Sequence, residues 1–196
     1  MTETDARLRG AVAIVALANF AYFGVEFIVA RSIGSVSLLA DSADFFEDAA
    51  VNFLIFAALG WTARKRAKVG MVLSAVLLAP ALAFLWTLWQ KFAAPVPPEP
   101  IALTITGSGA LIVNLCCAFV LARFRDHSGS LTRAAFLSAR NDALANIGII
   151  GAGLVTVAAP SIWPDIIVGI GIAWMNLDAA REVWSAARSE HREAEA

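Results

Sequence analysis

The chain has little of what a soluble or disulfide-bonded domain needs. Charged residues make up 16% of its 196 positions, whereas soluble domains average about 25%. Only two cysteines are present, Cys116 and Cys117. Because they are adjacent, they indicate no disulfide framework; we expect small packing residues, with a soft metal ligand as the alternative. No block of basic residues indicates a nucleic-acid partner. Residues 1–10 mix acids and bases ahead of a long apolar run, which does not fit a secretory signal peptide.

Apolar residues, by contrast, make up 59% of the chain, against about 45–50% in soluble domains. They gather into six stretches that each reach the roughly 20 residues needed to cross the hydrocarbon core: 11–30, 36–60, 69–90, 101–122, 134–157 and 163–184. We therefore expect an all-α membrane protein with six transmembrane helices. Residues 1–187 would form one transmembrane domain, and residues 188–196 a short polar tail without a metal-binding domain.

The basic residues predict the orientation. With a cytoplasmic amino terminus, the loops and tails on that side hold Arg7, Arg9, Arg64, Lys65, Arg66, Lys68, Arg123, Arg125, Arg133, Arg181, Arg188 and Arg192. The opposite side holds only Arg31 and Lys91. This asymmetry follows the positive-inside rule, so both termini should be cytoplasmic.

Four carboxylates interrupt the second apolar stretch: Asp41, Asp44, Glu47 and Asp48. A charged group near the bilayer centre costs a few kcal/mol, and such residues usually mark an ion or proton path. At about 100° per residue, the three aspartates fall within about 60° of one another on a helix. Asn52 lies one turn further along the same face. The pattern indicates a ladder of oxygen ligands on a membrane helix.

The two halves of the chain echo each other. The segment from Asp48 to Asn52 reappears as Asp142 to Asn146, three spans later and so in the opposite orientation. Asn19 and Asn114 stand at nearly equal distances upstream of the two aspartates, as 3+3 inverted repeats of transporters would require. Chance similarity in an alanine-rich chain is the alternative.

The fifth stretch carries Ser138, Asp142 and Asn146 on one helix face. Packing this face against the second stretch would bring Asp44, Asp48 and Asp142 together, with Ser138 as a possible fourth oxygen donor. Three aspartates in an apolar bundle need either a divalent cation or protons to neutralise them. A set of structural carboxylates paired with Arg140 or Arg31 is the alternative.

The sequence resembles the transmembrane domain of the cation diffusion facilitator family of divalent metal transporters. The resemblance covers most of residues 14–187 and rests on the order and spacing of four segments: 19–26, 34–48, 133–143 and 164–167. It implies a tetrahedral ion site at Asp44, Asp48, Ser138 and Asp142. It also implies metal/proton antiport by alternating access, usually in a homodimer.

The chain departs from the zinc transporters of that family at Ser138, which stands where they usually have histidine. No histidine lies in any predicted span, since His127 falls in a loop and His191 in the tail. Carboxylate and hydroxyl ligands suit harder ions such as Mn²⁺, whereas imidazole suits Zn²⁺. Ser138 would therefore be a weak or water-bridging ligand, and any dimer would form through the membrane helices.

We therefore predict a transporter that exports a divalent cation (Mn, Fe, Zn, Co or Cd) from the cytoplasm in exchange for protons, with no permanently bound cofactor. Asp41, Asn52, Asn146 and Glu26 would support the ligands or line the path. A bacterial plasma membrane fits the short loops, and an organelle stays open. The alternatives are a carrier of another cargo and a non-transporting partner subunit. An enzyme is the least favoured class, because no His or Cys constellation is present.

Overall fold

The computed structural model describes the backbone of residues 3–58, 78–123 and 130–175, and the side chains of residues 6–54, 56–57, 82–123 and 141–175. Within these ranges the chain forms helices and no strand. The helices are α1 (Glu3–Ile33), α2 (Val36–Ala58), α4 (Leu78–Ala93), α5 (Pro100–Ala122) and α6 (Ser130–Ala158). A further helix spans Trp163–Met175 and is called here the 163–175 helix.

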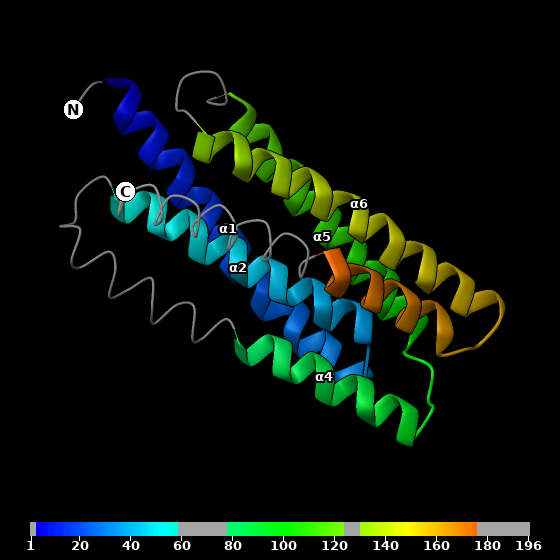
Figure 1. The fold of residues 1–196 in the computed structure, drawn as a ribbon. Helices are drawn as coiled ribbons and strands as arrows, with labels where there is room; N and C mark the ends of the chain where they lie inside the picture. The colour runs from blue at the N-terminus through cyan, green and yellow to red at the C-terminus, as the bar shows by residue number, and fades with distance from the viewer. Residues whose placement is uncertain (1–2, 59–77, 124–129, 176–196) are drawn as a thin grey trace, which may run out of the picture.

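The described helices lie side by side along one common axis (Figure 1). The connections at residues 34–35, 94–99 and 159–162 lie toward one end of the bundle, and the amino terminus lies at the other. The helix α1 packs on α2, and α5 packs on α6. The helix α2 also contacts α4, α5 and α6, so this carboxylate-bearing segment lies at the centre of the bundle.

Local signals set the helix ends. Glu99 caps α5 by accepting hydrogen bonds from the backbone nitrogens of Ile101 (3.0 Å) and Ala102 (2.5 Å), and Pro100 takes the first helical position, where its missing N–H is not needed. Gly34 separates α1 from α2 with a φ of 63°. This left-handed conformation costs glycine nothing and most other residues about 1–2 kcal/mol.

The start of α2 is capped by a residue that is distant in the sequence. Asp165, at the beginning of the 163–175 helix, is 0% exposed. Its carboxylate accepts hydrogen bonds from the Ser35 hydroxyl (2.6 Å), the Ser37 hydroxyl (2.6 Å) and the backbone nitrogens of Val36 (2.8 Å) and Ser37 (3.0 Å). Lys91 Nζ at the end of α4 lies 4.0 Å from the same carboxylate. Three helices are therefore joined at this end of the bundle.

The interior is packed with small and branched apolar side chains. One core cluster joins α1, α2, α5, α6 and the 163–175 helix through Ala30, Leu38, Leu39, Ala40, Leu103, Ile149, Ala152 and Ile172. A smaller cluster of Val15, Cys117, Ala118 and Leu121 joins α1 to α5. Large apolar side chains also cover the outside, among them Leu17, Ile28, Ile105, Phe119 and Leu154. An apolar exterior around buried polar groups is the arrangement that lipid requires.

Three described helices are long and apolar enough to cross a membrane: Ala6–Ile33, Pro100–Ala122 and Asn141–Ala158. They overlap the predicted spans 11–30, 101–122 and 134–157. The helix α2 has 23 residues, but its four carboxylates lower its hydropathy. The 163–175 helix is apolar but shorter. Parts of the predicted spans 69–90 and 163–184 lie outside the described residues, so the six-span arrangement stays a prediction.

Candidate functional site

The inner face of α2 carries the buried acidic groups of the bundle. Asp41 is 0% exposed and Asp44 is 8% exposed, Asp48 is half-buried, and Glu47 is exposed. This division follows from the helical period, because positions 41, 44 and 48 share one face and position 47 lies to one side.

Asp142 on α6 meets this face of α2. Asp48 is the charged group that acts most strongly on Asp142, and Asp142 is the charged group that acts most strongly on Asp44. The packing of α6 on α2 thus places Asp142 on the side of α2 that carries Asp44 and Asp48. Within the described part of the chain, no three His, Cys, Asp or Glu side chains are gathered closely enough to hold a metal ion.

The fourth predicted ligand, Ser138, lies on the helical backbone of α6, one turn before Asp142. Its side chain is outside the described residues, as is that of Arg140. The two histidines, His127 and His191, are outside them too.

A chain of polar side chains continues from Asp41 across three helices. Asn146 Nδ2 on α6 donates to Asp41 Oδ2 at 2.5 Å, and Asn114 Nδ2 on α5 donates to Asn146 Oδ1 at 2.9 Å. Glu26 on α1 is 0% exposed, and Asp41 is the charged group that acts most strongly on its carboxyl group. Asp41, Asn146 and Asn114 therefore form one hydrogen-bonded network, and Glu26 lies beside it.

The other two asparagines have different partners. Asn52 Nδ2 donates to the backbone oxygen of Asp48 at 2.8 Å, within α2. Asn19 Oδ1 on α1 accepts a weak hydrogen bond from Cys117 Sγ on α5 at 3.6 Å. Cys117 is buried in the smaller core cluster, which fits the packing role expected for it, whereas Cys116 is exposed. Arg31 donates to Thr87 Oγ1 on α4 at 2.8 Å, a bond that directs this cation to α4.

The amino-acid sequence alone indicates no role for Asp165 and predicts that Lys91 lies in an external connection. In the structure Lys91 lies within α4 and is 5% exposed, and its Nζ donates to the backbone oxygen of Val96 at 2.8 Å. The available signal was an aspartate directly after a proline at the start of an apolar stretch. That signal identifies a helix start, but it does not identify the second helix that the same aspartate caps.

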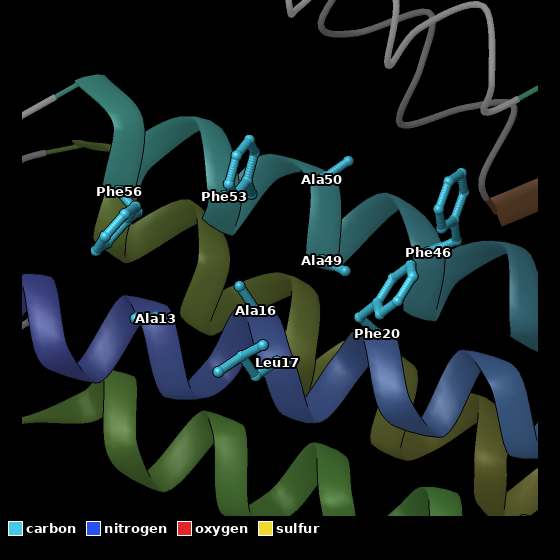
Figure 2. A pocket seen from close by; sticks show the side chains of 9 residues that line it. All are labelled: Ala13, Ala16, Leu17, Phe20, Phe46, Ala49, Ala50, Phe53 and Phe56. Atoms are coloured by element: carbon cyan, nitrogen blue, oxygen red, sulfur yellow. The ribbon is translucent and has the colours of Figure 1, made fainter. Parts of the chain in front are cut away.

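A pocket between α1 and α2 is chemically unsuited to ions. Figure 2 shows it between α1 and α2, with a volume of about 430 Å³. The side chains that line it are all apolar: Ala13, Ala16, Leu17, Phe20, Phe46, Ala49, Ala50, Phe53 and Phe56. The polar network lies elsewhere on α2.

An apolar helical bundle with carboxylates turned inward is the construction of a membrane carrier of cations. The family described as the cation efflux transmembrane domain matches residues 12–190 of the chain. The chain therefore belongs to the cation efflux family, whose members transport divalent metal cations, and it is an integral membrane protein of the transporter class. A search of curated proteins finds no match.

Proposed function

We propose that the protein exports a divalent metal cation from the cytoplasm in exchange for protons, and that Asp44, Asp48 and Asp142 bind the cation. The observation that supports this proposal most directly is that Asp142 on α6 interacts electrostatically with Asp44 and Asp48 on α2, where the two helices pack together. In an apolar bundle, three carboxylates at one place need a cation or protons.

The donor chemistry favours a hard or borderline ion. The three aspartates offer carboxylate oxygens, and Ser138 offers a hydroxyl one turn before Asp142 on α6. Oxygen donors suit Mn²⁺ and Fe²⁺ better than ions that prefer imidazole or thiolate. We therefore place Mn²⁺ and Fe²⁺ ahead of Zn²⁺, Co²⁺ and Cd²⁺ as cargo.

Metal binding requires a change from the arrangement described. A metal ion would have to draw Asp44, Asp48 and Asp142 toward itself, because no three such side chains among the described residues are gathered closely enough to hold one. Protons would take its place when the metal leaves, since ionised carboxylates only accept hydrogen bonds and can bond with each other only through a proton. Asn146 and Asp41 hold this part of α6 against α2, and Asn52 ties back to the Asp48 carbonyl.

We further propose six spans with both termini in the cytoplasm, arranged as an inverted 3+3 repeat. The asparagines support the repeat. Asn114 donates to Asn146 between α5 and α6. The matching residues on α1 and α2 are Asn19 and Asn52, both buried, and Asn19 Nδ2 and Asn52 Oδ1 have no partner among the described residues. A carrier whose two end states are related by the pseudo-two-fold axis of the repeat would make this second bond when it breaks the first.

The family resemblance supports a homodimer formed through the membrane helices, and the apolar exterior of α1 and α5 supports contact with lipid. Short connections such as residues 34–35 and 159–162 support placement in a bacterial plasma membrane. We treat residues 1–187 as the transmembrane domain and residues 188–196 as its tail.

A non-transporting partner subunit is the second candidate. The observation that favours it is the lack of a closely gathered ligand set in the described residues, together with Ser138 in place of an imidazole. Such a protein would keep the fold and bind no cargo.

Flux measurements separate the two candidates. The purified chain is reconstituted in liposomes with internal dyes for metal and pH, and Mn²⁺, Fe²⁺, Co²⁺, Zn²⁺ and Cd²⁺ are tested in turn. Proton movement driven by Mn²⁺ or Fe²⁺, and absent in Asp48→Ala, supports the antiporter. Silence with every metal in well-folded protein contradicts it and favours the partner subunit.

A further inference from the structure

Glu26 is a buried acid with no donor to satisfy it. It lies on the inner side of α1 and is 0% exposed. Neither of its carboxyl oxygens has a hydrogen-bond donor among the described residues, and the same holds for Asp41 Oδ1. A bare carboxylate in an apolar medium costs several kcal/mol. The position therefore requires a ligand that neutralises it.

The geometry narrows the choice of ligand. The polar group that Glu26 faces is the carboxyl group of Asp41, itself 0% exposed. Asp41 Oδ2 is already held by Asn146 Nδ2 at 2.5 Å, and Asn146 is held by Asn114. The hydrogen bond from Asn146 therefore occupies Oδ2 of Asp41, and Oδ1 is the oxygen of Asp41 that can share a proton with Glu26. An ionised carboxylate is only an acceptor, so the two groups can bond with each other only by sharing a proton.

Among the described residues, no positive charge acts on these two carboxyl groups to replace that proton. The charged groups that act on these two carboxyls are Asp44 and Asp48 from α2 and Asp142 from α6. The Tyr22 hydroxyl, on α1, also faces them, but it donates its proton to the Thr106 backbone oxygen at 2.6 Å. From α5 the neighbour in the network is the neutral Asn114.

We propose that Glu26 and Asp41, called here the carboxyl pair, bind one proton between them and form the entry site for the proton that is exchanged against metal. This inference deepens the proposed antiport and rests on it. The predicted spans contain no histidine, so the proton acceptors inside the bundle are carboxyl groups. Asp41 precedes Asp44 by one turn, toward the start of α2, which the predicted orientation places at the external side.

The proton balance is simple. A proton arriving from the external side forms an O–H bond within the carboxyl pair. It passes to the aspartates of the metal site once the cation has left outward, and it is released to the cytoplasm when the next cation binds. No other bond forms or breaks, and no further reactant is needed.

The test uses the full chain in liposomes, with Glu26→Gln and Asp41→Asn as variants. Glu47→Gln is the matched control, since Glu47 is an exposed acid on α2, the helix that carries Asp41. Three quantities are measured with Mn²⁺ as the probe: the infrared C=O band of protonated carboxyls in metal-free protein, Mn²⁺/Mn²⁺ exchange, and Mn²⁺ export coupled to protons. We expect each variant to lose part of the band, keep the exchange rate, and slow coupled export about 100-fold, as when a proton carrier is removed. Glu47→Gln should match the parent in all three.

The outcomes separate this inference from the antiport itself. If Glu26→Gln and Asp41→Asn keep the parent's infrared band and its proton-to-metal ratio, the carboxyl pair is not the proton site. If Mn²⁺ removes the band in Asp48→Ala protein, the pair binds metal instead and the inference is wrong. If the parent moves no metal at all, the antiport fails, while the infrared band still decides whether the pair holds a proton. Glu26→Gln and Asp41→Asn each test the carboxyl pair, so if one of these variants misfolds, the other still decides whether the pair holds the proton.

Discussion

Replacing Asp165 by alanine should destabilise the bundle more than any exposed cap would. The substitution leaves the backbone nitrogens of Val36 and Ser37 without their acceptor at a buried helix start. It also leaves the Lys91 ammonium without its counter-charge at 4.0 Å. Unsatisfied buried donors cost about 1–3 kcal/mol each, and truncating one partner of a buried ion pair costs about 3–5 kcal/mol. These costs do not add, because one carboxylate serves all of these groups, so we expect a loss near the larger of the two, about 3–5 kcal/mol, in the free energy of unfolding.

Glu99→Ala is the matched control. Glu99 caps α5 in the same way, with two backbone nitrogens, but it is exposed, so water can replace it at a cost of about 1 kcal/mol. Since 1 kcal/mol corresponds to roughly 2–4 °C for a chain of this size, thermal unfolding in detergent should show a drop of about 6–20 °C for Asp165→Ala and about 2–4 °C for Glu99→Ala.

Equal drops in the two variants would refute this reasoning, because burial would then contribute nothing. A second test uses Lys91. The unpaired charge of the buried Lys91 should account for a large part of the lost stability. Adding Lys91→Met to Asp165→Ala should then recover stability, since the double variant has no unpaired buried charge. If the double variant recovers no stability, the whole loss comes from the hydrogen bonds by which Asp165 caps α2.

Three further predictions follow from the packing and the ligand set. Gly169→Ala should lower the unfolding temperature by an amount equivalent to about 1–3 kcal/mol, because a Cβ there would lie 2.9 Å from the backbone that begins α2; Gly171→Ala, with open space around it, should not lower it. Asn146→Ala should cost about 1–3 kcal/mol in the same assay, because Asp41 loses its donor and Asn114 its acceptor. Ser138→His should raise Zn²⁺ flux relative to Mn²⁺ flux in liposomes, because it adds the ligand that zinc prefers.

Each of these has an outcome that contradicts it. Equal effects of the two glycine substitutions would mean that the 163–175 helix does not press on α2. An Asn146→Ala protein as stable as Asn114→Ser would mean that Asp41 does not depend on the amide. Unchanged metal preference in Ser138→His would mean that position 138 does not face the cargo.

The carboxylate ladder could be predicted from the sequence because it depends on one helix only. Positions 41, 44 and 48 share a face in any α-helix, and the structure buries Asp41 and Asp44 and exposes Glu47 as that period requires. The observed bounds of α2, 36–58, also lie close to the predicted span 36–60. Long apolar runs specify helices strongly, since the backbone has no other way to satisfy its hydrogen bonds in lipid.

The partnerships between helices could not be predicted in the same way. Asp165 caps a helix whose start is 129 residues earlier in the chain, and Glu26 meets Asp41 because α1 packs on α2 with a particular rotation. The hydropathy pattern predicts which residues of a helix face inward, but it does not predict which residues of other helices they contact, because apolar contacts are not directional. For Lys91, the charge alone suggested a loop, and the acceptors that allow its burial lie on other segments.

Binding of the transported cation by Asp44, Asp48 and Asp142, where α6 meets α2, can be measured directly. The measurement is equilibrium binding of Mn²⁺ to the purified chain, followed by electron paramagnetic resonance, with Asp142→Asn as the variant and Glu47→Gln as the control. We expect saturable binding in the parent and in Glu47→Gln, and none in Asp142→Asn. Parent-like Mn²⁺ binding in Asp142→Asn would mean that the metal site lies elsewhere.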